Sequence, residues 1–118
     1  PYVYCQFTHS KYSPRAGSSR LPWLTGAAAW SYYAAAQAIF GIQPDYDGLR
    51  IDPCLPSAWQ QVKLRRRFRN KWLNIEIRKD KGVQKGVREV LVNGRPLDGN
   101  LIGLDRLKDS NDVLVVMG

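Results

Sequence analysis

The chain divides into a stretch without charge and a stretch in which apolar and charged residues alternate. Residues 21–44 carry no charged side chain, and within them residues 27–40 are predicted as a helix that ends at Gly41 in a left-handed conformation. This helix presents apolar residues on nearly every face, so it needs packing neighbours all round. The remaining sequence predicts few other helices, and we therefore expect the chain to be a C-terminal piece of a larger protein. Pro22 and Gly26 interrupt the stretch, which is too rich in alanine to be a membrane span.

The clearest strand pattern covers residues 61–79, where apolar and basic residues alternate in the first half. This alternation predicts strands with one core face and one solvated face. The residues expected on the core face are Val62, Leu64, Phe68, Leu73, Ile75 and Ile77. Asn70 and Lys71 are the expected turn, so the segment is predicted as an antiparallel hairpin. Most of the basic run then lies on the solvated face, with Arg66 as the exception.

Further segments complete the β half of the chain. Strands are expected at residues 49–51, 87–92, 101–102 and 113–116. Asn93 followed by Gly94 is the strongest short hairpin signal in the chain. Together these strands predict a small antiparallel sheet of about five or six strands. We therefore predict an α+β fold, in which residues 1–45 end a helical domain and residues 46–118 form a sandwich-like, antiparallel β domain.

Groups that can bind an anion gather where the predicted helix begins. The Thr25 hydroxyl can cap the free amides of the first helical turn, and Gly26 has no Cβ, so a ligand or another backbone can come close. Amides, a hydroxyl and the helix dipole together make an anion site plausible here. The alternative is an ordinary capped helix that binds nothing.

Gln6 is the fully polar residue of an apolar, tyrosine-rich segment, residues 1–7, which precedes a predicted loop over residues 8–22. If it is buried, its amide needs a hydrogen-bond partner, because an unpaired buried polar group costs roughly 1–3 kcal/mol. That partner is either a backbone group or a sugar hydroxyl. His9, the single histidine, lies in the loop, where a solvated side chain is the default.

Composition and charge narrow the functional classes. The chain has 118 residues and a formal net charge of +8, which suits one small domain with an anionic partner. The basic residues around Arg65 alternate as a solvated strand face does, which argues against a polyanion or nucleic-acid binding module. That module, and a structural or carbohydrate-binding β domain, are the alternative functions. Cys5 and Cys54 fit neither a disulfide framework nor a metal site and are expected to be buried free thiols.

Three aspartates, Asp45, Asp47 and Asp52, look like an acidic cluster. Their spacing lacks the further oxygen ligands of a calcium loop, and their neighbours are turn-forming residues. We therefore expect neither a metal site nor a catalytic carboxylate among them.

Several motifs occur together in one order and spacing. They are Trp-Leu-Thr-Gly at residues 23–26, Trp30, Gly-Ile-Gln-Pro-Asp-Tyr-Asp-Gly-Leu at residues 41–49, and Asp-Pro-Cys-Leu-Pro at residues 52–56. In this arrangement the chain resembles the inverting disaccharide phosphorylases of glycoside hydrolase family 94, which include the cellobiose, cellodextrin and chitobiose phosphorylases. The resemblance covers residues 2–68 approximately and is weaker through the tail.

The resemblance implies a fold and a reaction. In the family the helical part is an (α/α)6 barrel, of which residues 27–40 would form the last helix. These enzymes are hexosyltransferase-type phosphorylases that cleave a β-glucosidic bond with inorganic phosphate, with inversion, to give α-glucose 1-phosphate and a shortened sugar. They need no cofactor besides phosphate as co-substrate. They are usually homodimers, and the reaction looks like a cytoplasmic step.

The resemblance also implies residue roles. Thr25 and Gly26 match positions that bind phosphate, and Gln6 matches a position that contacts the sugar. The general-acid aspartate of the family lies upstream of Pro1, so we expect no catalytic residue here and no turnover by this chain alone. The expected partners are a β-linked glucose disaccharide or oligosaccharide, phosphate and the upstream part of the same polypeptide, with no nucleic acid and no membrane. Which disaccharide is used does not follow from this sequence.

Overall fold

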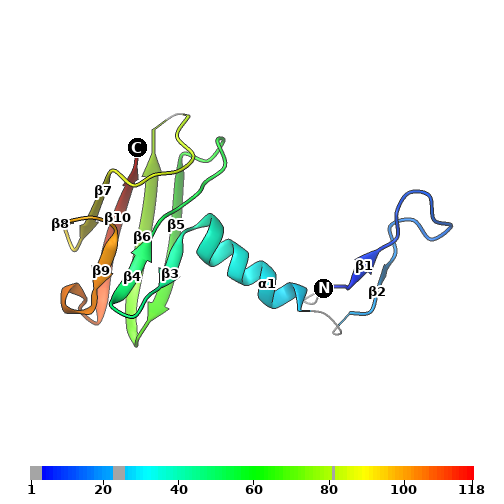
Figure 1. Cartoon of the computed structure of the whole chain (residues 1–118), viewed down its shortest axis with the longest axis horizontal. Coiled ribbons are helices and arrows are strands. Elements are labelled where there is room, and N and C mark those ends of the chain that lie inside the picture. The colour runs from blue at the N-terminus through cyan, green and yellow to red at the C-terminus, as the bar shows by residue number, and fades with distance from the viewer. Residues whose placement is uncertain (1–3, 23–25, 81) are drawn as a thin grey trace. The chain divides into compact units, whose positions relative to one another are not determined.

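A computed structural model of the protein describes residues 4–22, 26–80 and 82–118. The chain separates into two compact units, Pro1–Ala35 and Ala36–Gly118. We call them the N-terminal unit and the β unit. Their elements are labelled in Figure 1.

The N-terminal unit contains a short antiparallel ladder and most of a helix (Figure 1). Strand β1 (Phe7–Thr8) pairs with β2 (Ser19–Arg20), so the loop predicted over residues 8–22 is closed at its base by two short strands. Helix α1 (Ala27–Tyr33) continues as the π-helical segment η1 (Ala34–Ile39). The helix predicted over residues 27–40 is thereby confirmed, with its second half wound as a π-helix.

The helix is not covered by the part of the chain that the structure describes. No residue of α1 or η1 is buried. Trp30 is 72% exposed and Tyr32 is 68% exposed. These exposures agree with the expectation that residues outside this chain must pack around the helix. No helix among the described residues is both long and apolar enough to cross a membrane.

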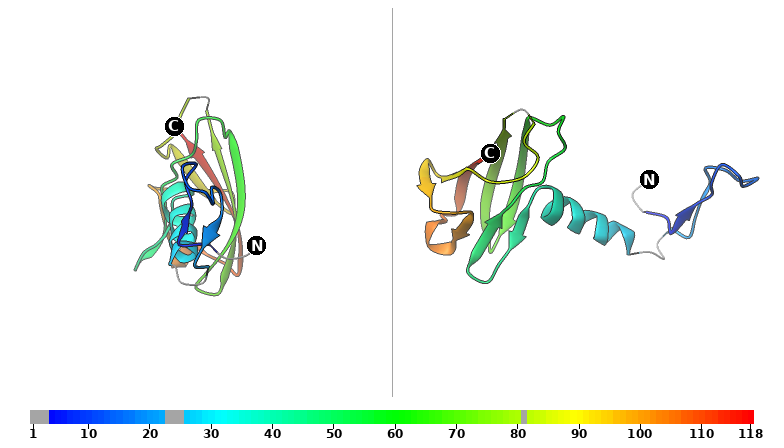
Figure 2. Two further views of the ribbon diagram at one scale, coloured as in Figure 1. Left: turned by 90° about the vertical axis from the view of Figure 1, so that its right-hand side faces the viewer. Right: turned by 45° about the horizontal axis from the view of Figure 1, so that its top comes forward.

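The described strands of the β unit form two sheets (Figures 1 and 2). The larger sheet has the order β5-β6-β10-β7-β8, with β5 (Gln61–Phe68), β6 (Lys71–Lys79), β10 (Ser110–Met117), β7 (Glu89–Val92) and β8 (Arg95–Leu97). The smaller sheet has the order β3-β4-β9, with β3 (Ile42–Pro44), β4 (Gly48–Ile51) and β9 (Leu101–Gly103). A short 3-10 helix, η2 (Leu104–Arg106), follows β9.

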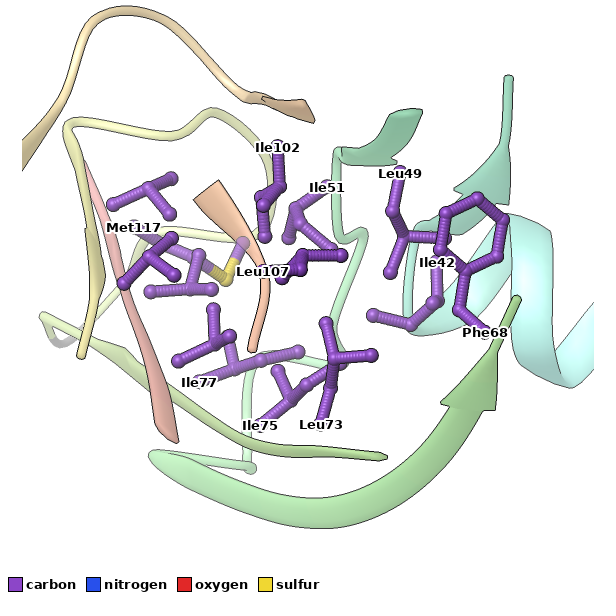
Figure 3. Close-up of a cluster of buried hydrophobic side chains, with 14 of the residues drawn as sticks. Ile42, Leu49, Ile51, Phe68, Leu73, Ile75, Ile77, Ile102, Leu107 and Met117 are labelled. Atoms are coloured by element: carbon purple, nitrogen blue, oxygen red, sulfur yellow. The ribbon is translucent and has the colours of Figure 1, made fainter. Parts of the chain in front are cut away.

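The two sheets share one hydrophobic core. In Figure 3, Ile51 and Ile102 of the smaller sheet face Leu73, Ile75 and Ile77 of β6. The alternation along β6 causes this arrangement, because successive side chains of a strand point to opposite faces. Each of these five side chains is at most 1% exposed, and burial of one such side chain stabilises the fold by about 1.5–3 kcal/mol. The core agrees with the prediction of a sandwich-like β domain.

One strand pair differs from the predicted antiparallel sheet. Strand β10 runs antiparallel to β7 but parallel to β6, so Val113 lies between Val92 and Ile75. Apolar alternation predicts which face of a strand is buried, but it does not specify the direction of the neighbouring strand. The connection from β6 to β10, which contains β7, β8 and β9, provides the crossover that a parallel pair needs. The sheet is therefore mixed.

The turn between β5 and β6 lies one residue earlier than predicted. The strand register makes Arg69 and Asn70 the turn, with φ of 45° and 64°, and Lys71 already belongs to β6. A two-residue hairpin of this kind needs positive φ at both positions, which asparagine tolerates far better than arginine. The Arg69 guanidinium donates hydrogen bonds to the backbone carbonyls of Asp45 and Tyr46, and these contacts offset the cost of its conformation.

Two other β predictions have different outcomes. Asn93 and Gly94 join β7 to β8 with φ of 53° and 75°, which confirms the predicted hairpin. Leu101 and Ile102 do form a strand, but this strand pairs with β4 in the smaller sheet. The prediction of one sheet is therefore wrong, because a strand pattern does not indicate which of two packed sheets the strand joins.

Candidate functional site

Of the predicted phosphate-binding pair, Gly26 lies at the start of α1. Gly26 is the residue that precedes the helix, with φ −79° and ψ 0°, and its carbonyl accepts a hydrogen bond from the Trp30 amide at 3.0 Å. A Cβ on Gly26 would lie 3.4 Å from Trp30 Cδ1, an ordinary contact distance. Neither the backbone conformation nor the described neighbours require glycine here. Thr25 lies outside the described residues.

Gln6, the predicted sugar-binding residue, directly precedes β1. Its backbone amide donates to the Arg20 carbonyl at 3.1 Å. The side chain is exposed, so within this chain its amide is not a buried polar group that needs a protein partner. No hydrogen bond between Gln6 and Gly26 occurs among the described residues. The assignment of Gln6 to a sugar stays a prediction.

A thiol and two hydroxyls lie beside Gln6. Thr8 Oγ1 lies 2.9 Å from Ser19 Oγ and 3.5 Å from Cys5 Sγ. Hydrogen bonds from Ser19 and, to a smaller extent, from Thr8 lower the pKa of the Cys5 thiol, because they stabilise the thiolate. Sequence spacing could not indicate this group, since it forms only when β1 pairs with β2. The prediction of buried thiols is wrong: Cys5 is half-buried and Cys54 is exposed, although both are free.

His9 is a local anchor of the loop between β1 and β2. Its Nδ1 lies 3.2 Å from Ser13 Oγ, and its ring packs edge-on against Phe7 with 5.4 Å between the ring centroids. The backbone amide of His9 donates to the carbonyl of Ser18 at 2.9 Å. These contacts make the side chain half-buried, where a solvated one was expected.

Two arginines on the exposed face of β5 contact the ring of Trp72 on the neighbouring strand. The guanidinium carbons of Arg65 and Arg67 lie 4.3 Å and 5.9 Å from the centroid of the Trp72 ring. Both arginines are exposed, which agrees with the predicted solvated face. Stacking of arginine on tryptophan is a common arrangement at protein surfaces and needs no nucleic acid to explain it.

Glu76 neutralises part of the same face. Arg78 forms an ion pair with it, and Lys63 Nζ lies 3.8 Å from its carboxylate. The hydrogen bond from Arg78, and a smaller one from Gln61, hold the pKa of Glu76 below its usual value despite some desolvation. The open hollow of about 620 Å³ on this side of the sheet is lined by charges of both signs, including Asp112. Such a surface lacks the single sign of charge that a polyanion site needs.

Two of the three aspartates lie close to basic side chains of the same unit. Asp45 forms an ion pair with Arg50 at 3.0 Å, and Asp52 lies 3.7 Å from Lys85 Nζ. Across residues 4–22, 26–80 and 82–118, no group of three or more histidine, cysteine, aspartate or glutamate residues is arranged to hold a metal ion.

Comparison with known proteins divides the chain into two matches. Residues 1–41 match the catalytic domain of the glycosyl hydrolase 94 superfamily, and residues 42–97 match the C-terminal domain of glycosyl hydrolase family 65. The second match covers strands of both sheets of the β unit.

Three curated relatives are phosphorylases. Over all 118 residues the chain is 36% identical to N,N'-diacetylchitobiose phosphorylase of Vibrio furnissii, of which it covers 14%. Over 101 residues, 86% of the chain, it is 31% identical to solabiose phosphorylase of Paenibacillus borealis, of which it covers 13%. Over 83 residues, 70% of the chain, it is 37% identical to cellobionic acid phosphorylase of Neurospora crassa, of which it covers 10%. The chain thus spans a small part of the length of each relative.

Proposed function

We propose that this chain, whose residues 1–41 match the catalytic domain of the glycosyl hydrolase 94 superfamily, is part of a longer phosphorylase that cleaves a β-glucosidic bond with inorganic phosphate. The observation that carries this proposal is the similarity of the entire chain to N,N'-diacetylchitobiose phosphorylase. The matches to a catalytic and a C-terminal domain, which meet between residues 41 and 42, support it.

The proposed reaction needs few groups from this chain. A phosphate oxygen attacks the anomeric carbon, the bond from that carbon to the glycosidic oxygen breaks, and a carboxylic acid gives its proton to the leaving oxygen. One carboxylic acid is enough, because phosphate replaces the water that a second carboxylate would have to activate. Attack from the face opposite the leaving group inverts the anomeric centre, so a β-glucoside gives α-glucose 1-phosphate. The acid would come from the remainder of the polypeptide, so residues 1–118 alone would be inactive.

In this proposal, Thr25 and Gly26 hold the phosphate. A hydroxyl, backbone amides and the positive end of a helix dipole suit an anion, and the position of Gly26 before α1 supports the assignment. The exposed Gln6 would bind a sugar hydroxyl. Helix α1 and η1 would belong to the last helix of an (α/α)6 barrel, of which residues 1–45 would be the C-terminal end, and residues 46–118 would be the β domain that follows it. A cytoplasmic homodimer completes the proposal.

The first experiment assays the full-length polypeptide with β-linked disaccharides and inorganic phosphate. We expect phosphate-dependent release of a sugar 1-phosphate from at least one of cellobiose, N,N'-diacetylchitobiose and laminaribiose, in the α configuration by NMR. The 118-residue chain alone should release none. Hydrolysis that is independent of phosphate, or cleavage with retention, would contradict the proposed reaction.

The second experiment tests the anion site through Thr25→Ala. Loss of one hydrogen bond to a charged ligand costs about 1.5–3 kcal/mol, so the apparent KM for phosphate should rise about tenfold or more, with less change in the KM for the disaccharide. Ser110→Ala, which removes an exposed hydroxyl from β10, is the matched control and should leave both constants unchanged. Unchanged phosphate kinetics in Thr25→Ala would remove Thr25 from the site.

A further inference from the structure

The loop that joins β3 to β4 has a fixed backbone. The Asp45 amide donates to the Gly48 carbonyl at 2.9 Å, and Asp45 Oδ1 accepts from the Tyr46 amide at 2.7 Å. Arg50 Nη2 bonds Asp45 Oδ2 at 3.0 Å. A Cβ on Gly48 would lie 2.1 Å from the Ile102 carbonyl oxygen, so the end of the loop lies directly against β9. We call residues 45–48 the Tyr46 loop.

Arg69, from the turn between β5 and β6, adds a second clamp. Its Nη2 donates to the carbonyl of Tyr46 at 2.9 Å and to that of Asp45 at 3.3 Å. Arg69 holds φ at 45°, a conformation that non-glycine residues other than Asn, Asp and His rarely adopt. Such positions persist where the surrounding structure fixes them, and they concentrate at functional sites. Two arginines, Arg50 and the strained Arg69, thus hold the backbone that carries Tyr46.

Tyr46 is presented almost entirely to solvent by this rigid loop. At 92% it is the most exposed of the large hydrophobic side chains in the described residues. An isolated exposed tyrosine is ordinary, but a tyrosine on a fixed backbone loses little conformational entropy on binding. Tyrosine is also among the side chains that dominate the energy of protein interfaces. A protruding side chain suits a pocket on another protein surface, whereas small ligands bind in concave sites.

We propose that the Tyr46 loop is an anchor that inserts Tyr46 into an apolar pocket on the remainder of its own polypeptide. The pocket would offer an acceptor for the phenol hydroxyl and a cation for the exposed Asp47. The reason for this occupant is chain length, since the chain covers 14% of its relative N,N'-diacetylchitobiose phosphorylase. The remainder of the polypeptide would therefore offer a large surface. Because that surface would belong to the same polypeptide, its effective concentration would be high. The inference rests on one part of the proposed function, namely that the chain belongs to a longer polypeptide, and it does not depend on the reaction.

The direct test is hydroxyl-radical footprinting of the full-length protein. We expect the labelling rate of Tyr46 to be at least about tenfold lower in the native protein than in the same protein unfolded in urea, since a buried anchor excludes water. In residues 1–118 expressed alone, Tyr46 should be labelled almost as fast as in the unfolded chain. Equal labelling of Tyr46 in the native and unfolded full-length protein would overturn the proposal.

Variants of the full-length protein identify the occupant. Tyr46→Ala should raise the rate of limited proteolysis between the β unit and the remainder about tenfold or more, with the native mass by light scattering unchanged. Tyr12→Ala is the matched control, because Tyr12 is also exposed, at 85%, and should leave the rate unchanged. A Tyr46→Ala protein that changes its native mass at an unchanged proteolysis rate would overturn the proposal, because a second copy would then be the occupant.

A third variant and the activity assay distinguish failure of the anchor proposal from failure of the proposed function. If Tyr46→Ala does not fold, Asp47→Lys, which reverses one exposed charge, should raise the proteolysis rate severalfold; no change would overturn the proposal. A wild-type protein without phosphorolysis would contradict the proposed function, but protection of Tyr46 would still be measurable. An active wild type with a fully labelled Tyr46 would contradict the anchor alone.

Discussion

The β unit and helix α1 use their apolar residues in opposite ways. In the β unit, apolar side chains of two sheets face one another, and Ile77 and Val115 are 0% exposed. In α1, none of the residues is buried, and Trp30 is 72% exposed. Short helices obtain most of their stability from packing of an apolar face. The comparison teaches that the β unit carries its own core, whereas the described residues of this chain leave the apolar side chains of α1 without one.

The largest expected effect comes from the helix, and it depends on context. Trp30→Ala should destabilise the full-length protein by about 3–5 kcal/mol, the usual cost of removing a buried tryptophan side chain. In residues 1–118 alone, the same change should alter the free energy of unfolding by less than about 0.5 kcal/mol, as for an exposed residue. Urea unfolding of both proteins measures the two values. Equal values would show that the helix is as self-contained as the β unit.

For Ile77→Ala, in contrast to Trp30→Ala, we expect the loss of stability to be nearly the same with and without the remainder of the polypeptide. Ile77 is fully buried within the β unit, so its truncation should cost about 2–5 kcal/mol in residues 1–118 alone. The remainder of the polypeptide should change this cost little, because the neighbours of Ile77 in the core belong to the same unit. Arg78→Ala, at the next position on the solvated face, is the control and should cost under about 1 kcal/mol. A small cost for Ile77→Ala would contradict a self-contained core.

The parts of the fold that the sequence predicted are those that depend on local pattern. The helix end at Gly41 is one case, since its φ of 65° is the predicted left-handed stop. A Cβ at Gly41 would also lie 2.1 Å from the Asp52 carbonyl oxygen, which excludes other residues. The faces of β5 and β6 are another case, because the period of two determines both. Gln6 and Gly26 could be placed by motif, but their roles depend on ligands and residues outside this chain.

What could not be predicted depends on pairing between distant segments. Alternation does not reveal that β6 and β10 are parallel, nor that Leu101 and Ile102 join a second sheet. Lys79 is a further example. It reads as one more basic residue of the hairpin, yet it is buried, and its ammonium donates to the carbonyls of Pro56 and Val83, each at 2.7 Å. The contact forms only when the segments that contain Pro56, Lys79 and Val83 come together in the folded protein.

Asn111 gives the next smaller effect. It is 1% exposed, and its amide nitrogen donates to the carbonyls of Lys108 at 2.7 Å and Trp72 at 3.1 Å. Its oxygen accepts from the Lys108 amide at 2.8 Å. Asn111→Ala leaves these buried groups without partners, so we expect a loss of about 2 kcal/mol in residues 1–118 by urea unfolding. Asn74→Ala, an exposed control on the same sheet, should cost under about 0.5 kcal/mol.

The smallest expected effect is the pH dependence of the Tyr46 loop. The hydrogen bond from Arg50, and a smaller one from the Tyr46 amide, hold the pKa of Asp45 below its ordinary value. A carboxyl group with a lowered folded pKa stabilises the fold above its unfolded pKa of about 3.9, and this contribution is lost as the pH falls toward the folded value. The free energy of unfolding should therefore fall slightly more in wild type than in Asp45→Asn between about pH 5 and pH 2.

The difference between wild type and Asp45→Asn is the quantity to compare, because Glu76 titrates in the same direction in both proteins. Identical pH dependence would mean that the Arg50 ion pair does not stabilise the loop, and the fixed backbone under Tyr46 would then rest on Arg69 and Gly48.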